Sequence, residues 1–140
     1  MLKDAQKLNK PILTHLALHV SDIGRSIDFY KFFCQLELVH ERTGKKEKTI
    51  WLAENKKNYS FVLVLIGGGC KKQHQIDDYT HIGFSVNSKG DVDSISKLAR
   101  EKSCLLWPAT QAPYPVGYYC GLVDPDGYTV EFSYDQPIAD

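Results

Sequence analysis

The sequence has 140 residues, of which 43% are hydrophobic and 24% are charged, enough apolar material for one compact domain with its own core. Seventeen lysines and arginines balance seventeen aspartates and glutamates. This balance argues against nucleic acid or an anionic membrane as the partner, because both attract proteins with an excess of positive charge. A small molecule is therefore the expected ligand.

Residues 1–10 form a polar extension without the apolar core of a signal peptide, and no run approaches the length of a membrane span. We therefore expect a soluble, cytoplasmic protein. The four cysteines are widely spaced and form no Cys-x-x-Cys pair, which in a reducing compartment predicts free thiols. They are Cys34, Cys70, Cys104 and Cys120.

The first half of the expected domain spans residues 11–66. Its opening segment, Thr14–Val20, alternates large apolar with small or polar residues, as a strand does. Asp22 is placed to cap a helix, whose apolar residues recur at helical spacing: Ile23, Ile27, Tyr30 and Phe33. Three further strands are predicted, at Leu36–Glu41, Thr49–Ala53 and Tyr59–Ile66.

A polar, glycine-rich stretch at residues 67–78 predicts a flexible linker. It lacks the Gly-Lys-Ser/Thr ending of a phosphate-binding loop. The second half, residues 79–140, repeats the pattern of the first. A strand at Thr80–Val86 precedes a helix that Ser88 or Asp91 could cap. The remaining strands are predicted at Cys104–Pro108, Gly117–Val123 and Tyr128–Tyr134, and Asp124-Pro125-Asp126-Gly127 predicts a hairpin turn before the last.

The two halves are related by an internal repeat. Thr14-His15-Leu16-Ala17-Leu18-His19-Val20 is echoed by Thr80-His81-Ile82-Gly83-Phe84-Ser85-Val86. Each half reads as strand, helix and three strands, so the sequence predicts an α+β fold built from two βαβββ modules.

Three residues stand out as candidate metal ligands. Side chains alternate between the faces of a strand, which puts His15, His81 and Glu131 on the less apolar face of their strands. If the halves fold alike, the histidines occupy equivalent positions and converge with the carboxylate. Two imidazoles and one carboxylate suit Fe²⁺, Mn²⁺, Ni²⁺ or Zn²⁺ and leave coordination positions open.

A structural role is the simpler explanation for an isolated histidine, and we assign His19, His40 and His74 no metal on that ground. His15 and His81 differ because they occupy matching repeat positions. An acidic residue within an apolar strand such as Tyr128–Tyr134 also needs a partner, because burying a lone carboxylate is costly.

The repeat and these residues together resemble the vicinal oxygen chelate superfamily, which includes glyoxalase I, extradiol dioxygenases, methylmalonyl-CoA epimerase, fosfomycin-modifying enzymes and bleomycin-binding proteins. The resemblance covers Leu13–Tyr134, and its motifs include Thr14–Asp22, Thr80–Val86 and Asp124–Glu131. It implies two modules that curl into an incomplete barrel around one divalent metal ion. It also implies homodimers, with the site formed within one chain or between two.

The resemblance assigns the metal to His15, His81 and Glu131. Glyoxalase I and the epimerase have a fourth ligand in the last strand of the first module. Matching Tyr59-Ser60-Phe61-Val62 to Tyr128-Thr129-Val130-Glu131 puts Val62 at that position, and this weakens the isomerase reading. The fosfomycin-modifying enzymes resemble one another in having a hydroxyl-bearing residue two positions after the first histidine. Ala17 occupies that position here, so a phosphonate site is not expected.

Three functions therefore remain open. We slightly favour a dioxygenase-type enzyme acting on a small molecule with vicinal oxygens, with His19, Tyr118 and Tyr119 as candidates for proton transfer. A glyoxalase-like lyase or isomerase is the alternative. The third is a drug-binding protein without catalysis, whose aromatic walls would be Trp51, Trp107, Tyr118 and Tyr119.

Overall fold

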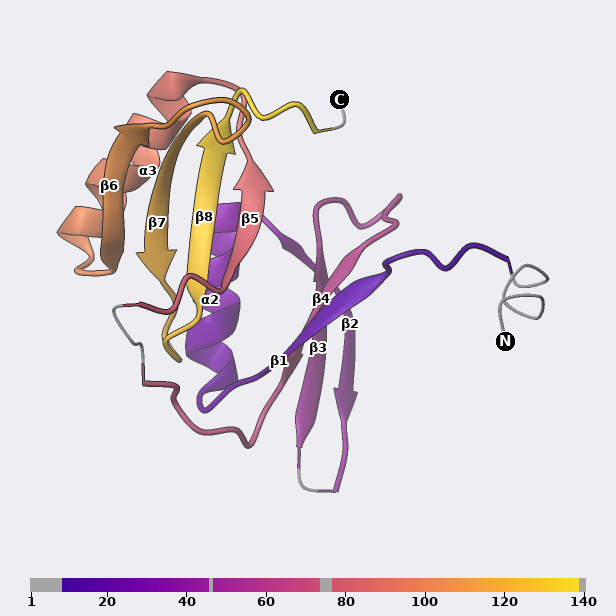
Figure 1. Cartoon of the computed structure of the whole chain (residues 1–140). Coiled ribbons are helices and arrows are strands. Elements are labelled where there is room, and N and C mark those ends of the chain that lie inside the picture. Colours follow the sequence, from indigo (N-terminus) through magenta and orange to yellow (C-terminus); the bar gives the residue numbers. More distant parts are fainter. Residues whose placement is uncertain (1–8, 46, 74–76, 139–140) are drawn as a thin grey trace.

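The computed structural model describes residues 9–45, 47–73 and 77–138. The first module contains β1 (His15–His19), α2 (Ile23–Cys34), β2 (Glu37–Thr43), β3 (Lys48–Ala53) and β4 (Val62–Ile66). The second contains β5 (His81–Ser85), α3 (Lys89–Glu101), β6 (Leu105–Gln111), β7 (Tyr118–Val123) and β8 (Thr129–Tyr134). The predicted α+β fold with two βαβββ modules is confirmed (Figure 1).

Each module forms its own four-stranded sheet, with strand order β1-β4-β3-β2 in the first and β5-β8-β7-β6 in the second. The opening strand of each module runs parallel to its last strand, and the other neighbours are antiparallel. Among the described residues no strand of one sheet pairs with a strand of the other, and no closed barrel is formed. β1 and β5 are therefore both edge strands.

Side-chain caps fix where the helices begin. The Asp22 carboxylate accepts a 3.1 Å hydrogen bond from the backbone N–H of Arg25, as the sequence predicts. Between the two candidate caps of α3, the structure selects Ser88, whose hydroxyl oxygen accepts from the backbone N–H of Asp91 at 3.0 Å. Asp91 instead lies in the first turn, where its charge complements the helix dipole.

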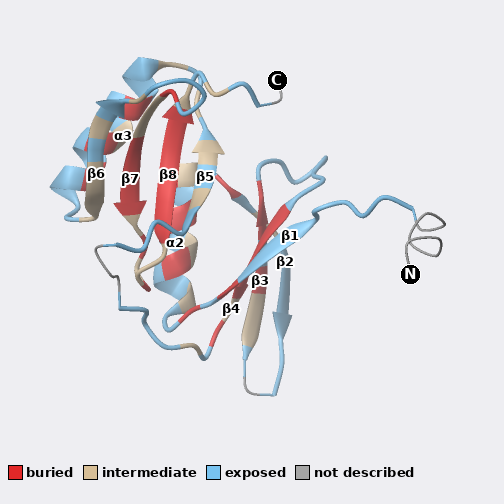
Figure 2. Ribbon diagram, in the orientation of Figure 1, coloured by how far each residue is buried: buried red, intermediate tan, exposed pale blue. Residues whose placement is uncertain are grey.

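One hydrophobic core joins the two modules. It includes Leu18 and Leu65 from the first sheet, Tyr30 from α2, and Leu122 and Phe132 from the second sheet. α2 lies behind the second sheet and beside the first in Figure 1. The helix-facing sides of both sheets contribute to this shared core. The opposite side of each sheet lies outside the core, and we call it the open face of that sheet. Figure 2 shows the buried residues concentrated in β7, β8 and the inner strands of the first sheet.

The turn between β7 and β8 connects the modules. The predicted hairpin is present: the N–H of Gly127 donates to the carbonyl of Asp124 at 3.1 Å, and Gly127 has φ +94°. The two turn carboxylates also reach the first module. Asp126 accepts a 2.9 Å bond from the backbone N–H of Ser21, and Asp124 accepts a 2.7 Å bond from the Tyr30 hydroxyl. The sequence indicated only the turn.

The predicted linker is hydrogen-bonded at several points. The N–H of Gly69 donates to the carbonyl of Val20 at 2.9 Å, and that of Lys72 donates to the carbonyl of Asp126 at 2.6 Å. Residues 1–8 of the predicted extension and residues 74–76 of the linker, with His74, lie outside the described part of the chain. No helix in the described part is long and apolar enough to cross a membrane.

Candidate metal centre

His81 and Glu131 lie together on the open face of the second sheet. The register of the parallel pair β5–β8 places Gly83 opposite Glu131, so the His81 side chain is a diagonal neighbour of the carboxylate. The Nε2 atom of His81 is 3.5 Å from Oε2 of Glu131. Glu131 is only 8% exposed, and a carboxylate at that burial needs a cation or a donor beside it.

The backbone fixes the orientation and tautomer of His81. Its Nδ1 lies 2.6 Å from the carbonyl oxygen of Tyr79. Because a carbonyl only accepts, Nδ1 carries the hydrogen and a neutral ring has its lone pair on Nε2. In that form the Nε2 lone pair would face the Glu131 oxygen, and a cation between these two electron-rich atoms would stabilise the pair. An Nδ1–H donated to a backbone carbonyl is also how metal-binding histidines are commonly held.

Aromatic side chains surround this pair. The Trp107 ring lies 5.6 Å from the His81 ring and 6.3 Å from that of Tyr119, with edge-to-face geometry in both cases. Gly121 makes room for the indole, because a Cβ at this position would lie 2.3 Å from Trp107 Cε3. The pair therefore has an apolar wall on one side, as small-molecule sites often do.

His15 lies on the open face of the first sheet, apart from the other two candidates. Its Nδ1 is 2.9 Å from the Thr14 hydroxyl oxygen, and the residue is exposed. It lines a cavity of about 520 Å³ whose other walls include Trp51, Val62 and Val64. No group of three or more potential metal ligands exists among the described residues of a single chain, so His81 and Glu131 are brought together and His15 is not.

The three candidates for proton transfer lie in different parts of the structure. The Tyr118 hydroxyl hydrogen-bonds Asp93 of α3, which places it on the helix side of the second sheet, away from Glu131. Tyr119, the next residue of β7, has its side chain on the open face beside Trp107. His19 lies at the far end of β1 from His15, and its carbonyl accepts a 3.3 Å hydrogen bond from the Tyr128 hydroxyl.

Comparison with known proteins decides the family. A family model described as the Glyoxalase/Bleomycin resistance protein/Dioxygenase superfamily matches residues 12–132. The chain belongs to this superfamily. A relative in Pseudomonas aeruginosa, the uncharacterized protein PA2024, is 46% identical over 128 residues, which cover 91% of each chain.

Solved structures of the superfamily share the fold. A glyoxylase/bleomycin resistance protein/dioxygenase domain from Frankia sp. EAN1pec superimposes with a TM-score of 0.73 at 18% identity, covering 91% of this chain and 100% of that one. The fosfomycin resistance protein FosX from Listeria monocytogenes gives 0.72 at 16% identity, covering 92% and 97%. A FosX mutant in complex with Mn(II) and 1S,2S-dihydroxypropylphosphonic acid gives 0.69 at 18%, covering 89% and 93%.

The strand register corrects the residue-by-residue match between the two modules that the sequence suggested. His15 pairs with Val62 in the first module, and His81 pairs with Thr129 in the second. Val62 is therefore equivalent to Thr129, and the position equivalent to Glu131 is occupied by Val64, which is 8% exposed. The sequence match was two residues out because the first module has no turn motif like Asp124–Gly127 to anchor it. Neither valine can bind a metal.

Proposed function

We propose that this chain is a divalent-metal-dependent enzyme that acts on a small organic molecule with adjacent oxygen atoms. His15, His81 and Glu131 are the proposed ligands of one Fe²⁺, Mn²⁺, Ni²⁺ or Zn²⁺ ion. The observation that carries the proposal is the His81–Glu131 pair, whose buried carboxylate oxygen lies 3.5 Å from an oriented imidazole nitrogen. The Mn(II) complex of a FosX mutant with the same fold supports a divalent ion.

The proposed site lies between two copies of the chain. Its first support is that His15 stands apart from His81 and Glu131 within the described residues of one copy. Its second is that β1 and β5 are edge strands, which are inclined to pair with another strand. The third is exposed apolar surface around the first residues of these strands, namely Ile12, Leu13, Leu16 and Tyr79. A symmetric dimer with β1 of each copy beside β5 of the other would form two such sites.

Residues of this chain would bind and orient the substrate. When bound, a divalent ion polarises substrate oxygens as a Lewis acid and leaves room for them, because the protein supplies only three ligands. Val62, Val64 and Trp51 would supply an apolar wall for the body of the substrate. Tyr119, on the open face near Trp107, is the proposed proton-transfer residue.

The ligand set favours a dioxygenase-type reaction over isomerisation. A glyoxalase-like lyase or isomerase would need a fourth metal ligand, a carboxylate or an amide, at the position that Val64 occupies. Valine can neither coordinate a metal nor accept a proton. The lyase is the second candidate. A drug-binding protein without catalysis would need no oriented imidazole–carboxylate pair, so it ranks third.

Metal content tests the proposal directly. Protein purified without chelator should contain about one divalent ion per chain, and His81→Ala or Glu131→Gln should lose it. His40→Ala is the matched control, because His40 packs on Trp51 at 5.3 Å and is not a proposed ligand. Loss of metal from His40→Ala alone, or metal retained in His81→Ala, would refute the site. Oxygen uptake with catechols, after anaerobic loading with Fe²⁺, then separates the dioxygenase from a lyase active on hemithioacetals.

Mixing variant chains tests whether two copies share the site. His15→Ala and His81→Ala each lack one ligand, but a mixed dimer would contain one complete site. Equal mixing should recover about a quarter of the wild-type metal content, because about half of the dimers are mixed and each has one complete site of two. His81→Ala mixed with Glu131→Gln is the control and should recover none. A site within one chain predicts no recovery in either mixture.

A further inference from the structure

A second cavity lies where the two modules meet, apart from the proposed metal ligands. It has a volume of about 830 Å³ and is bounded by α2 on one side and by residues 102–104 and 123–125 on the other. We call it the inter-module groove. Neither His15, His81 nor Glu131 lines it. Its volume falls within the range that small-molecule sites in proteins occupy.

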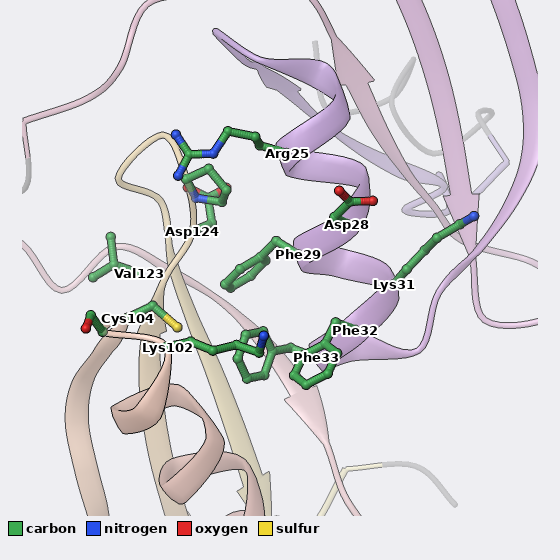
Figure 3. Close-up of a pocket in the computed structure, with 12 residues that line it drawn as sticks. Arg25, Asp28, Phe29, Lys31, Phe32, Phe33, Lys102, Cys104, Val123 and Asp124 are labelled. Carbon is green, nitrogen blue, oxygen red and sulfur yellow. The ribbon is translucent and has the colours of Figure 1, made fainter.

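Aromatic rings from α2 form one wall of this groove. Phe29 and Phe33 are 8% and 7% exposed, and their ring centroids are 5.0 Å apart. Phe32 packs edge-to-face on Phe33 with centroids 4.8 Å apart but remains 49% exposed. Figure 3 shows the Phe29 ring pointing into the groove toward the wall that carries Cys104. Rings in this arrangement offer faces and edges to a further aromatic group.

The groove is lined by five charged side chains: three cations, Arg25, Lys31 and Lys102, and two carboxylates, Asp28 and Asp124. Arg25 lies at the end next to Asp124, and Lys102 lies at the other end beside Phe32 (Figure 3). Lys102 Nζ is 4.6 Å from the centre of the Phe32 ring, whereas the Arg25 side chain makes no ion pair within the described residues. The two carboxylates leave an excess of one positive charge. Asp124 is buried and accepts hydrogen bonds from Tyr30 and from the turn, whereas Asp28 is exposed to solvent.

We propose that the inter-module groove binds a small aromatic carboxylate, with its ring on the phenylalanine wall and its carboxylate on Arg25. The planar guanidinium of Arg25 can donate two parallel hydrogen bonds to a carboxylate. Lys102 adds positive charge at the opposite end. Such a ligand contacts α2 of the first module and the second sheet together, so its binding stabilises the packing of the modules on each other.

The probe for this proposal is 2-naphthoate, with the neutral 2-naphthamide as its matched analogue. Isothermal titration should show that wild-type protein binds the acid about tenfold more tightly than the amide, because only the acid pairs with Arg25. The variant Arg25→Gln should remove this preference, and Arg25→Lys should retain part of it. Lys97→Gln is the matched control: it removes one positive charge from an exposed residue of α3 that does not line the groove.

Nuclear magnetic resonance locates the binding. On addition of 2-naphthoate, backbone amide signals of residues 29–33, 102–104 and 123–124 should shift, and those of β1 and β5 should not. Equal affinity for acid and amide in the wild type would overturn the proposal without the use of any variant. It would also be overturned if Lys97→Gln weakened binding as much as Arg25→Gln, or if the shifts appeared on the open face of the first sheet.

Discussion

The Tyr30 hydroxyl donates a 2.7 Å hydrogen bond to the Asp124 carboxylate, and this bond joins the helix of the first module to a turn of the second. Both residues are buried, at 0% and 4% exposure. Asp124 also accepts from the backbone N–H groups of Asp126 and Tyr128 at 2.9 and 2.8 Å. The same carboxylate thus shapes the turn and anchors α2, so its partners affect how the modules pack.

Removing the Tyr30 hydroxyl should destabilise the fold. Tyr30→Phe leaves a buried carboxylate oxygen without its donor, and we expect the free energy of unfolding to fall by about 1–3 kcal/mol. Urea denaturation followed by circular dichroism measures this loss. Tyr114→Phe is the control, because Tyr114 is 84% exposed and its variant should be as stable as the wild type. A change below about 0.5 kcal/mol in Tyr30→Phe would show that this bond contributes little.

The charge on Asp124 should make stability depend on pH. Burial raises the pKa of Asp124, although hydrogen bonds from Tyr30, Tyr128 and Asp126 lower it in part. A pKa above the unfolded-state value means that the folded protein binds the proton more tightly. The resulting stabilisation is complete below the unfolded-state pKa and is lost as the pH rises through the folded-state pKa.

The free energy of unfolding of the wild type, minus that of Asp124→Asn, should therefore decrease as the pH rises from about 4. Denaturant titrations of both proteins at a series of pH values measure this difference. The subtraction removes the contribution of other carboxylates, which the two proteins share. A difference that grew with pH would mean that the hydrogen bonds outweigh burial at this carboxyl group.

A methyl group at Gly121 should disturb the proposed metal centre. The Cβ of an alanine would lie 2.3 Å from Trp107 Cε3 and 2.7 Å from Cδ2, so the indole, which packs on the His81 ring, must shift. We expect Gly121→Ala to cost about 1–3 kcal/mol of stability and to change the tryptophan fluorescence. At Gly83 the nearest contact would be 3.7 Å, to Glu131 Oε2, so Gly83→Ala is the control with little effect on folding. Equal losses in both variants would contradict this steric explanation.

The four thiols should differ in reactivity. All four are free, as the sequence predicted, and Cys70 is exposed whereas Cys120 is fully buried. Burial raises the pKa of the Cys120 thiol to about 12 and also raises that of Cys34, so neither forms the reactive thiolate at neutral pH. A disulfide reagent should modify Cys70 first. Cys70→Ser should lose the fast phase of this reaction and Cys34→Ser should keep it; the reverse result would contradict the burial assignment.

Local rules predicted the order of the elements well but not the ends of every strand. The strand predicted at Cys104–Pro108 continues to Gln111, although proline cannot donate to a neighbouring strand. It does so because β6 is an edge strand, where proline is tolerated, and the register shifts between Trp107 and Thr110. The strand predicted from Tyr59 begins at Val62, because the preceding residues do not pair.

The face that a residue occupies was predictable, but its neighbours were not. Alternation along β7 separates Tyr118 from Tyr119, yet only the Asp93 contact reveals which of the two faces the helix. Similarly, the sequence marks Asp124 and Asp126 as turn residues, and nothing local indicates that both hydrogen-bond the first module. These contacts join residues about a hundred positions apart and depend on how the modules pack.

The sequence by itself determined the two modules, the cap of the first helix and the three residues that resemble a metal site, because strand alternation, helical spacing and capping are set by neighbours along the chain. Only the tertiary structure decided that His81 and Glu131 meet, that His15 stands apart from them in one copy, and that a groove with aromatic and charged walls lies beside α2. The physical reason is that the first depends on the pairing of β5 with β8, and the other two depend on packing the helix-facing sides of two sheets into a single core. Both are fixed by contacts between distant parts of the chain.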